Sequence, residues 1–385
     1  LPRPGPRLAR PRPQAPGALD RVTGSPADHE TPPPADSRSR LWAAAVAFLV
    51  LAVLVAIAAV LPVPYIVLSP GPTFNTIGEV DGVPLVEIRD TPTFPVTGNL
   101  DMTTIREFGE PRSTLSVFQA LAAWVDPAQA VLPRELLYQD DESGEDVERR
   151  NAVLFSTSQS NAIAAAMTAL GKTVIADLVV VAVYEDAPAY GKVNPGERIL
   201  EVNGTPVTTP EEVVEGVRTG DIGSTVTLTV EREGTPLDVE LVTEANPDDP
   251  SVPYIGITAG YNFRAEFPIE FTLEDVGGPS AGMMFALAIV DKLTPQDLTG
   301  GGHVAGTGTV DPSGQVGPIG GIRQKLAAAA GAGATLFLMP VAHCEESQGH
   351  VPEGLAVAPV ATLTEAIDAI DAWREGRALP TCPAA

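Results

Sequence analysis

The sequence predicts an α+β protein in which a single apolar helix precedes two folded regions. Three observations lead to this prediction. Residues 41–61 form an uncharged apolar run, residues 176–243 alternate β-like runs with Gly and Pro turns, and strand and helix patterns alternate from residue 252 to about 373. With 385 residues, 44% of them hydrophobic, the chain is long enough for two or three domains with apolar cores.

The N-terminal segment changes character at residue 41. Residues 1–40 hold ten prolines and seven arginines with almost no bulky apolar side chain, so we predict a disordered tail. Leu41–Leu61 follows, and its 21 residues would span about 31 Å as a helix at ~1.5 Å per residue, which matches a bilayer core. We therefore predict an uncleaved transmembrane helix over residues 41–62. A cleavable signal peptide would have a shorter apolar region, and a buried core helix would show a polar face.

The charges beside this helix predict its orientation. Arg38 and Arg40 flank its N-terminal end, and positive charge favours the cytoplasmic side. We expect a single-pass protein of the cell membrane, with a cytoplasmic N-terminus and residues 63–385 outside the cytoplasm. A disulfide between Cys344 and Cys382 is then permitted, although two free thiols remain an alternative.

Residues 63–175 are predicted to form a juxtamembrane α/β segment. Short β-like runs come first, and helices are expected over Leu115–Trp124 and from about Val147 to Leu170. Residues 140–146 between these helices are a solvated acidic loop. The second helix has a strong apolar face that needs a partner, so we expect the segment to pack on the C-terminal domain.

Residues 176–245 have the pattern of a small β domain. Val179–Val183 is a predicted strand, Asn203-Gly204 a tight turn, Thr209 a helix N-cap, and Glu233-Gly234 a hairpin turn. Residues 195–204 read Pro-Gly-x-x-Ile-Leu-x-Val-Asn-Gly, and this run resembles a bacterial PDZ domain. The resemblance implies binding of peptide termini or strands by β-augmentation, or a spacer or lid without ligand. No carboxylate-binding loop is recognisable before Val179.

Residues 246–375 are predicted to form an α/β domain, followed by a tail over residues 376–385. The upstream segment 97–105 has strand character suited to covering the edge of its sheet, so we expect the PDZ-like unit to be inserted into this fold. A separate juxtamembrane domain is the alternative. The expected strands are Ile255–Thr258, Phe267–Leu273, Val304–Val310 and Thr335–Met339, and the expected helices are Ser280–Leu293, Ile322–Ala330 and Leu363 to about Trp373.

A serine and a lysine in this domain can supply nucleophilic chemistry. Ser280 opens an apolar helix after a Gly-Gly-Pro turn, and Lys325 lies among Gly, Ala and aliphatic residues. Burial there would depress the lysine pKa, so a neutral amine could take the serine proton. Taken singly, Ser280 fits a plain helix N-cap better and Lys325 fits a solvated helix lysine at least as well; only the two together favour the catalytic interpretation. Lys292 is a poorer base, because twelve helical residues separate it from Ser280 by about 18 Å.

The surrounding motifs resemble the proteolytic domain of Lon-type Ser–Lys peptidases. Gly278–Gly282 is similar to the nucleophile motif, Ala305–Val310 to a Thr-Gly strand, and Gly314–Lys325 to the segment that ends in the catalytic lysine. The resemblance implies that Ser280 is the nucleophile, Lys325 the general base, and Thr307 a hydroxyl that orients the amine. It also implies supporting roles in the nucleophile turn for its remaining members, Gly278, Pro279 and Ala281.

The whole chain resembles the membrane-anchored, PDZ-containing Lon-like proteases of Gram-positive, actinobacterial type. It has no GxxxxGK[ST] motif, so we expect an ATP-independent serine endopeptidase that cleaves flexible or unfolded segments of exported or membrane proteins. The alternative is a non-catalytic PDZ scaffold or adaptor for exported proteins.

Composition narrows the partners. A net charge of −25 argues against nucleic acid, whose phosphates require Lys and Arg. The histidines form no HExxH motif, and the stretch His343–His350 fits a surface loop better than a metal site. We expect no metal and no cofactor. The expected partners are protein or peptide substrates, the membrane through one helix and, because Lon-type domains commonly form rings, a homo-oligomer.

Overall fold

The computed structural model describes residues 37–109, 111, 113–138, 143–273 and 276–383. The predicted disordered tail lies outside the described residues up to position 36, as do residues 140–142 of the predicted acidic loop. The contacts divide the chain into one unit that ends at Ala56 and a second that begins at Ile57.

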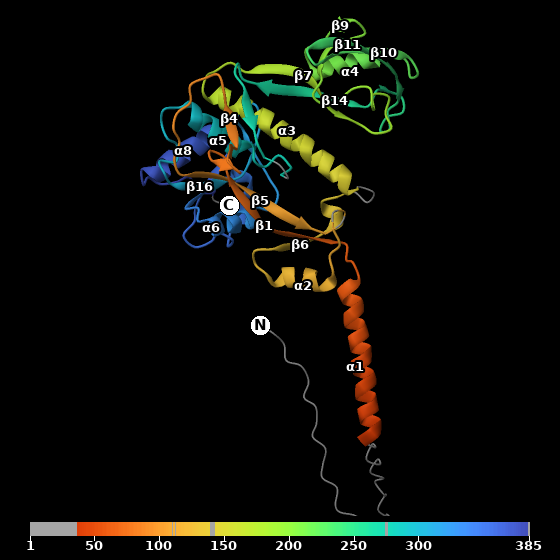
Figure 1. Cartoon of the computed structure of the whole chain (residues 1–385), viewed down its shortest axis with the longest axis vertical. Helices are drawn as coiled ribbons and strands as arrows, with labels where there is room; N and C mark the ends of the chain where they lie inside the picture. Colours follow the sequence, from red (N-terminus) through yellow and green to blue (C-terminus); the bar gives the residue numbers. More distant parts are fainter. Residues whose placement is uncertain (1–36, 110, 112, 139–142, 274–275, 384–385) are drawn as a thin grey trace, which may run out of the picture. The chain divides into compact units, whose positions relative to one another are not determined.

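Helix α1 (Ser37–Val60) contains the predicted apolar run (Figure 1). Within it, the segment Arg40–Val60 has a mean hydropathy of 3.0, and its most apolar stretch is not buried against the rest of the described protein. Its length and composition therefore suffice to cross a membrane. The helix thus begins four residues before the predicted start and ends one residue before Leu61.

The larger sheet of the second unit joins strands from both ends of the chain. Strands β16, β19 and β20 run parallel to one another and to β5, whereas β1 pairs antiparallel with β5 and with β6. In sheet order the strands are β20 (Ala356–Val360), β19 (Leu336–Pro340), β16 (His303–Gly306), β5 (Asn99–Phe108), β1 (Tyr65–Asn75) and β6 (Ala130–Pro133).

Helices cover both faces of this sheet. The side chains of β19 alternate, because Leu336 and Leu338 enter the core formed with α3, α5 and α8, whereas Phe337 and Met339 pack with α6. The cores are almost entirely aliphatic, which holds the two layers against the sheet. The helices are α3 (Gly144–Ala169), α5 (Gly282–Leu293), α6 (Ile322–Ala332) and α8 (Leu363–Arg374).

A second sheet has its own core beside helix α4 (Pro210–Arg218) (Figure 1). Thr209 caps α4 through a capping box with Glu212, as its sequence predicts. The two hairpin turns also lie where expected, because Asn203 and Glu233 both have positive φ. In sheet order the strands are β11 (Thr235–Val242), β10 (Thr225–Arg232), β8 (Arg198–Val202), β7 (Ile175–Val183) and β14 (Ile257–Arg264), with β9 (Thr205–Pro206) beside β8.

Shorter elements complete the described part. Cys344 and Cys382 form a disulfide, which ties the C-terminal segment to α7. The elements are β2 (Glu79–Val80), β3 (Val83–Pro84), β4 (Val86–Ile88), α2 (Val117–Val125), the 3₁₀ helix η1 (Arg134–Leu136), β12 (Glu244–Ala245), β13 (Pro253–Tyr254), β15 (Ile269–Phe271), β17 (Thr309–Val310), β18 (Val316–Gly317), the 3₁₀ helix η2 (Val341–His343) and α7 (Cys344–Ser347).

Three expectations need correction. The predicted boundary at residue 246 does not follow the sheets, because β14 pairs antiparallel with β7 over its whole length, from Ile257 to Arg264. The strand expected over Phe267–Leu273 is only three residues long and pairs with β4 instead of joining the large sheet. The strand expected over Val304–Val310 is interrupted, because β16 ends at Gly306 and β17 starts at Thr309.

Candidate functional site

The turn before α5 presents Ser280 without using it as a helix cap. The helix begins at Gly282, not at Ser280 as expected, and its N-cap is Ala281, whose side chain makes no capping hydrogen bond. The backbone O of Ser280 accepts from Gly308 N–H at 2.9 Å, and Met283 N–H returns a bond to Gly308 O at 3.0 Å. The turn is therefore fixed against the β16–β17 segment, and the serine hydroxyl is left for another partner.

Helix α3 holds the other side of this turn. Gly278 N–H donates to Asn151 O at 3.0 Å, and Ser158 Oγ donates to Pro279 O at 3.0 Å. The approach is close: a Cβ on Gly282 would lie 2.9 Å from Ser158 Oγ. Nothing in the sequence motifs pointed to Asn151 or Ser158, because these residues lie more than a hundred positions upstream and belong to no recognised pattern.

Helix α6 places Lys325 one turn from its start. Gly321 is the N-cap in the left-handed region (φ 70°), and a Cβ there would lie 2.8 Å from Ile105 of β5, so glycine is required on both counts. Ile322 and Leu326 are fully buried, which fixes the rotation of the helix. Lys325 itself is only 2% exposed.

The amine of Lys325 lies between two hydroxyl groups. Nζ is 2.7 Å from Ser280 Oγ and 2.9 Å from Thr307 Oγ1. Thr307 Oγ1 in turn donates to Ser280 O at 3.0 Å. Burial lowers the pKa of Lys325 from 10.5 to about 7, because the apolar surroundings penalise the charged form. The amine is therefore neutral in a large fraction of molecules near neutral pH.

The other lysines do not approach this site. Lys292 Nζ donates to Val86 O at 2.7 Å, and burial lowers the pKa of Lys292 as well, but its partner is a backbone carbonyl of β4 and not a hydroxyl. Lys192 Nζ lies near Glu240 O in the second sheet, and Lys172 is exposed beyond the end of α3. Lys292, the alternative base in the sequence, therefore does not contact Ser280.

A cleft of about 530 Å³ opens over the Ser280–Lys325 pair. One wall is β5, where Arg106 and Glu107 add charge, and the other is the turn that carries Ser280. The lining residues are Pro72, Phe74, Met102–Glu107, Asn151, Val276–Ala281, Ile319, Gly320 and Lys325. Residues Met102–Glu107 of β5 and Ser280 therefore line the same cleft.

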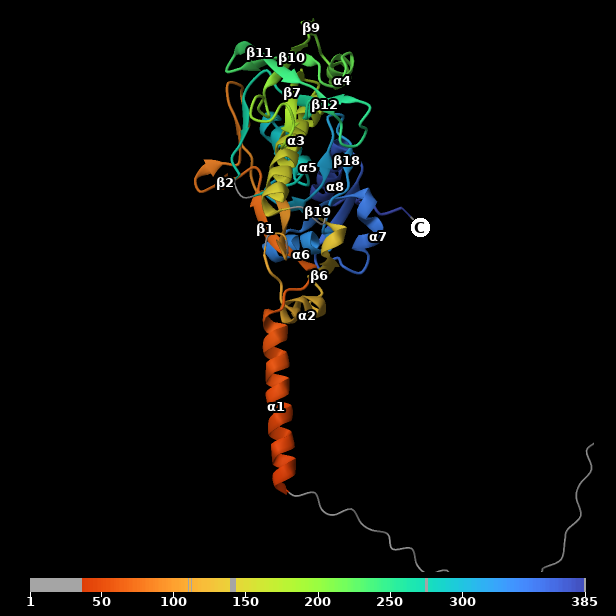
Figure 2. The same ribbon diagram turned by 90° about the vertical axis from the view of Figure 1, so that its right-hand side faces the viewer.

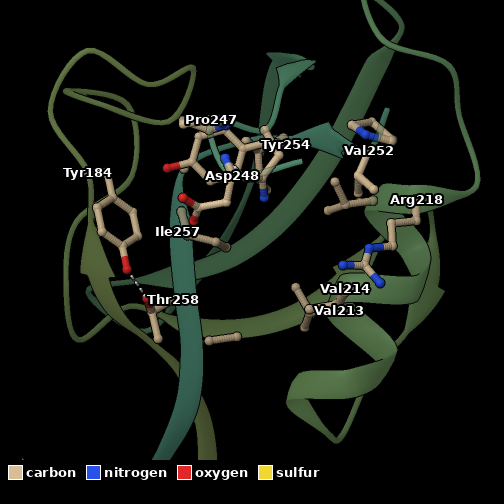
Figure 3. A pocket seen from close by; sticks show the side chains of 16 residues that line it. Tyr184, Val213, Val214, Arg218, Pro247, Asp248, Val252, Tyr254, Ile257 and Thr258 are labelled. Carbon is tan, nitrogen blue, oxygen red and sulfur yellow. Dashed lines mark hydrogen bonds between the residues drawn. The ribbon is translucent and has the colours of Figure 1, made fainter. Parts of the chain in front are cut away.

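A second cavity, of about 390 Å³, lies between α4 and the edge strand β14 (Figure 3). Val213, Val214 and Arg218 of α4 face Ile257 across it. The edge of β14 is not paired with another strand of the described sheet, so its backbone can accept a further strand.

One end of this groove is closed by a segment that the sequence reading did not identify. The sequence shows no recognisable carboxylate-binding loop before Val179, and the structure instead lines the groove here with Pro253–Gly256, which comprises β13 and the turn before β14. Gly256 has φ 77°, and a Cβ there would lie 2.0 Å from Ala187 Cβ. The tight turn at this Gly was the available signal.

The histidines and cysteines form no metal site among the described residues, where no cluster of three or more His, Cys, Asp or Glu has suitable geometry. His343 is buried, not in a surface loop as expected: its Nε2 accepts from Ile319 N–H at 2.9 Å, and its Nδ1 lies 3.1 Å from Glu346. His303 pairs with Asp101 at 2.8 Å, away from Lys325.

Comparison with known proteins identifies both folded regions. Residues 151–243 match the model of the PDZ domain, and residues 274–370 match the model of the Lon protease (S16) C-terminal proteolytic domain. Ser280, Thr307 and Lys325 all lie within the second match.

Similar curated proteins are Lon proteases. That of Clostridioides difficile is 37% identical over 93 residues, which are 24% of this chain and 11% of the relative. Lon protease 1 of Hydrogenovibrio crunogenus is 40% identical over 91 residues, 23% and 11% of the two chains. The chain thus spans about a tenth of the length of these relatives.

Solved structures match the PDZ region of the chain. The PDZ domain of an SdrC-like protein from Listeria innocua is 24% identical with a TM-score of 0.20, covering 22% of this chain and 92% of that one. A solution structure from Geobacillus thermodenitrificans is 31% identical with a TM-score of 0.19, covering 20% and 88%. The chain therefore combines an N-terminal helix that is apolar enough to span a membrane with a PDZ domain and a Lon-type serine protease domain.

Proposed function

We propose that this chain is an ATP-independent, membrane-anchored serine endopeptidase in which Ser280 is the nucleophile and Lys325 the general base. One observation carries the proposal: the buried amine of Lys325, with its pKa lowered to about 7, lies 2.7 Å from Ser280 Oγ. A serine next to a neutral amine in a cleft open to an extended chain is suited to acyl transfer.

The hydrogen bonds of Thr307 orient the amine. Its one hydroxyl proton goes to Ser280 O, so Thr307 Oγ1 must accept an N–H from Lys325. With a proton committed to Thr307, the nitrogen lone pair of the neutral amine can face Ser280 Oγ. Thr307 would thereby hold the base in its accepting geometry.

Each chemical step follows from this arrangement. The amine takes the hydroxyl proton while Ser280 Oγ bonds to the substrate carbonyl carbon. The C–N bond then breaks, and the Lys325 ammonium returns the proton to the leaving amine, which leaves an ester on Ser280. Water activated by the same amine hydrolyses this ester. The N-terminal end of α5, which begins two residues after Ser280, would supply positive potential for the developing oxyanion, although Met283 N–H is already bonded to Gly308 O.

The substrates we propose are flexible or unfolded segments of exported or membrane proteins. The sequence has no P-loop with which to drive unfolding by ATP, and a cleft of about 530 Å³ suits an extended segment better than a folded surface. The groove beside β14 would take a further strand or terminus of the same protein. We do not assign nucleic acid as a partner, given the net charge of −25.

For topology we propose a cytoplasmic N-terminus, with the protease outside the cytoplasm. Arg38 and Arg40 lie at the N-terminal end of α1, and the Cys344–Cys382 disulfide suits an oxidising compartment. Protease shaving of intact cells should reach residues after the helix. A homo-oligomer remains a proposal, which the mass of the detergent-solubilised protein would test.

Product mapping separates the enzyme from the scaffold alternative. The full chain in membranes would be incubated with an unfolded exported protein, and the products would be sequenced by mass spectrometry. Cleavage by the wild type and none by Ser280→Ala supports the enzyme. Retention of the protein by both forms without any cleavage would instead support a PDZ scaffold.

A further inference from the structure

The most exposed large apolar side chains that follow the apolar helix are gathered in two short elements. Among the described residues from Pro62 onward, only Val125 (77%), Trp124 (75%) and Leu136 (67%) are more than 60% exposed. Two of them end α2, and the third ends η1. Neighbouring solvent-exposed side chains of this size, such as Trp124 and Val125 at the end of α2, mark an interaction surface.

Both elements are hydrogen-bonded to the residues that leave the apolar helix. Val63 N–H donates to Leu115 O at 2.9 Å, just before α2, and Arg134 N–H at the start of η1 donates to Pro64 O at 3.1 Å. Leu61 ends the apolar run, so three residues of chain, at most about 10 Å, separate its end from both attachment points. This distance is fixed by covalent and hydrogen bonds alone.

Helix α2 has one inner and one outer apolar face. Ala120 and Ala123 pack inward with Val67 and Val131, which anchors the helix on β1 and β6 (Figure 2). The outer face carries Phe118, Leu121 and Val125 at helical spacing, with Trp124 beside them. No Lys or Arg occurs in α2.

We propose that this outer face, which consists of Phe118, Leu121, Trp124 and Val125, docks into the lipid interface of the membrane that α1 spans. The inference rests on the proposed membrane anchor. Lipid is the occupant that fits, because Val63, two residues beyond the end of the span, is hydrogen-bonded to Leu115, which lies just before α2. Trp is also the side chain most suited to the boundary between headgroups and acyl chains. With no basic residue on α2, docking relies on apolar burial and not on anionic lipid.

Docking would set the height of the protease cleft above the membrane. Glu107, which lines the cleft, pairs with Leu68 of β1, and Leu68 is seven residues beyond Leu61. Even a fully extended chain places that end of the cleft no more than about 25 Å from the end of the span. A docked α2 would stop the domain from tilting away, so the enzyme would favour cleavage sites close to a substrate's own membrane segment.

Tryptophan quenching in vesicles tests the docking directly. The full chain would be reconstituted, at a dilution that gives single chains per vesicle, into phosphatidylcholine with brominated acyl chains. In the Trp42→Phe variant the remaining tryptophans are Trp124 and Trp373. Emission should fall in brominated vesicles, and the fall should disappear when Trp124→Tyr is added. The additional quenching of the wild type relative to Trp42→Phe reports Trp42 and shows separately that the span is inserted.

Two results would overturn the proposal. One is an inserted span whose Trp124 is not quenched at any dilution. The other is a Trp124 that becomes protected only at high protein density, which would make the face an interface between copies of this chain.

Activity measurements separate this proposal from the proposed catalytic function. Leu121→Glu with Val125→Glu should keep full activity on a short soluble peptide, because neither residue lines the cleft. On a membrane-anchored substrate with a near and a distant site, the variant should lose its preference for the near site. Ile222→Glu, at another exposed apolar position outside α2 and η1, should keep that preference. A variant with an unchanged preference would contradict the role in cleft height.

Discussion

The protease cleft and the PDZ groove are built from different kinds of sequence information. The cleft depends on Ser280, Thr307 and Lys325, which lie in three short motifs of one domain and meet within 3.0 Å. The groove depends on α4, on β14 and on a turn between them whose residues have no distinctive chemistry. Chemistry that needs a particular atom restricts the sequence strongly, whereas a surface that binds a backbone restricts it weakly.

The largest expected effect is at the dyad. Ser280→Ala or Lys325→Met should each lower kcat by about 10⁴-fold or more, because nucleophile and base act as a unit. Lys292→Met is the matched control, since its amine bonds a carbonyl near β4, and it should keep most of its activity. Steady-state cleavage of a fluorogenic peptide provides the measurement. Comparable losses for Lys292→Met and Lys325→Met would refute the assignment.

Thr307 should have the next largest effect. Thr307→Val removes the hydroxyl that fixes the amine and should lower kcat by about 10²-fold with little change in KM, because a misdirected base affects the chemical step. Thr307→Ser keeps the hydroxyl and should recover most of the rate. If Val and Ser variants lose equal activity while both remain folded, Thr307 is only a packing residue.

The peptidase activity should depend on pH through the amine of Lys325. The neutral amine is the active form, so kcat/KM should rise with pH and level off above the pKa of about 7. At pH 6 it should be about tenfold below the plateau. A rate that falls from pH 6 to 8 would exclude a lysine base.

The same group predicts the pH dependence of stability. The pKa of Lys325 is about 7 in the folded chain and 10.5 when it is exposed, so between these values the unfolded chain binds a proton that the folded chain does not. The free energy of unfolding should therefore increase with pH across this window. Lys325→Met should lack this contribution, which urea unfolding at several pH values can measure.

The PDZ groove should give a smaller, substrate-dependent effect. Val214→Glu places a charge in the groove and should raise KM for an unfolded protein substrate by about fivefold, the effect of about 1 kcal/mol. Hydrolysis of a short peptide should not change. Leu237→Glu, on β11 outside the groove, is the control. Equal effects on protein and peptide would show that the groove does not hold substrate.

The sequence predicted local turns, caps and the residues of the candidate site better than it predicted how distant strands pair. Turns and caps such as Thr209 and Asn203-Gly204 were predicted because they depend on local backbone geometry. The place of β14 was not, because strand pairing over eighty residues leaves no local mark. The strand expected through Thr307 is interrupted after this residue, because Thr307 N–H still donates to Leu338 O of β19 whereas Gly308 N–H donates to Ser280 O in the turn before α5.

The residues that hold the turn carrying Ser280 could not be predicted from the sequence either. Asn151 acts through its backbone carbonyl, which any residue could supply, and Ser158 looks like any other serine in a helix. His343 was misjudged for a related reason: a His beside a Cys and acidic residues has the composition of a loop, and only the fold shows that Ile319 N–H meets its ring. Backbone partners of this kind are set by tertiary packing.

Two serines on α3 provide the finest test of the comparison between cleft and groove. Ser158 donates to Pro279 O in the nucleophile turn, whereas Ser160, two positions on, accepts from Phe263 N–H of β14 at 2.6 Å. Each alanine variant removes one hydrogen bond worth about 1 kcal/mol, so similar losses of thermal stability are expected. Their catalytic effects should differ. Ser158→Ala should lower kcat for a short peptide by about fivefold, because Pro279 no longer holds Ser280 in place.

Ser160→Ala should leave peptide hydrolysis unchanged and affect only protein substrates that use the groove. The melting temperatures of the two variants would be measured first, to check that both lose similar stability. Their kcat and KM would then be compared on both substrate types. If both lower kcat for the short peptide equally, the strand that forms the groove and the turn that carries Ser280 are coupled through α3. The cleft and the groove would then have to be treated as one functional unit and not as two.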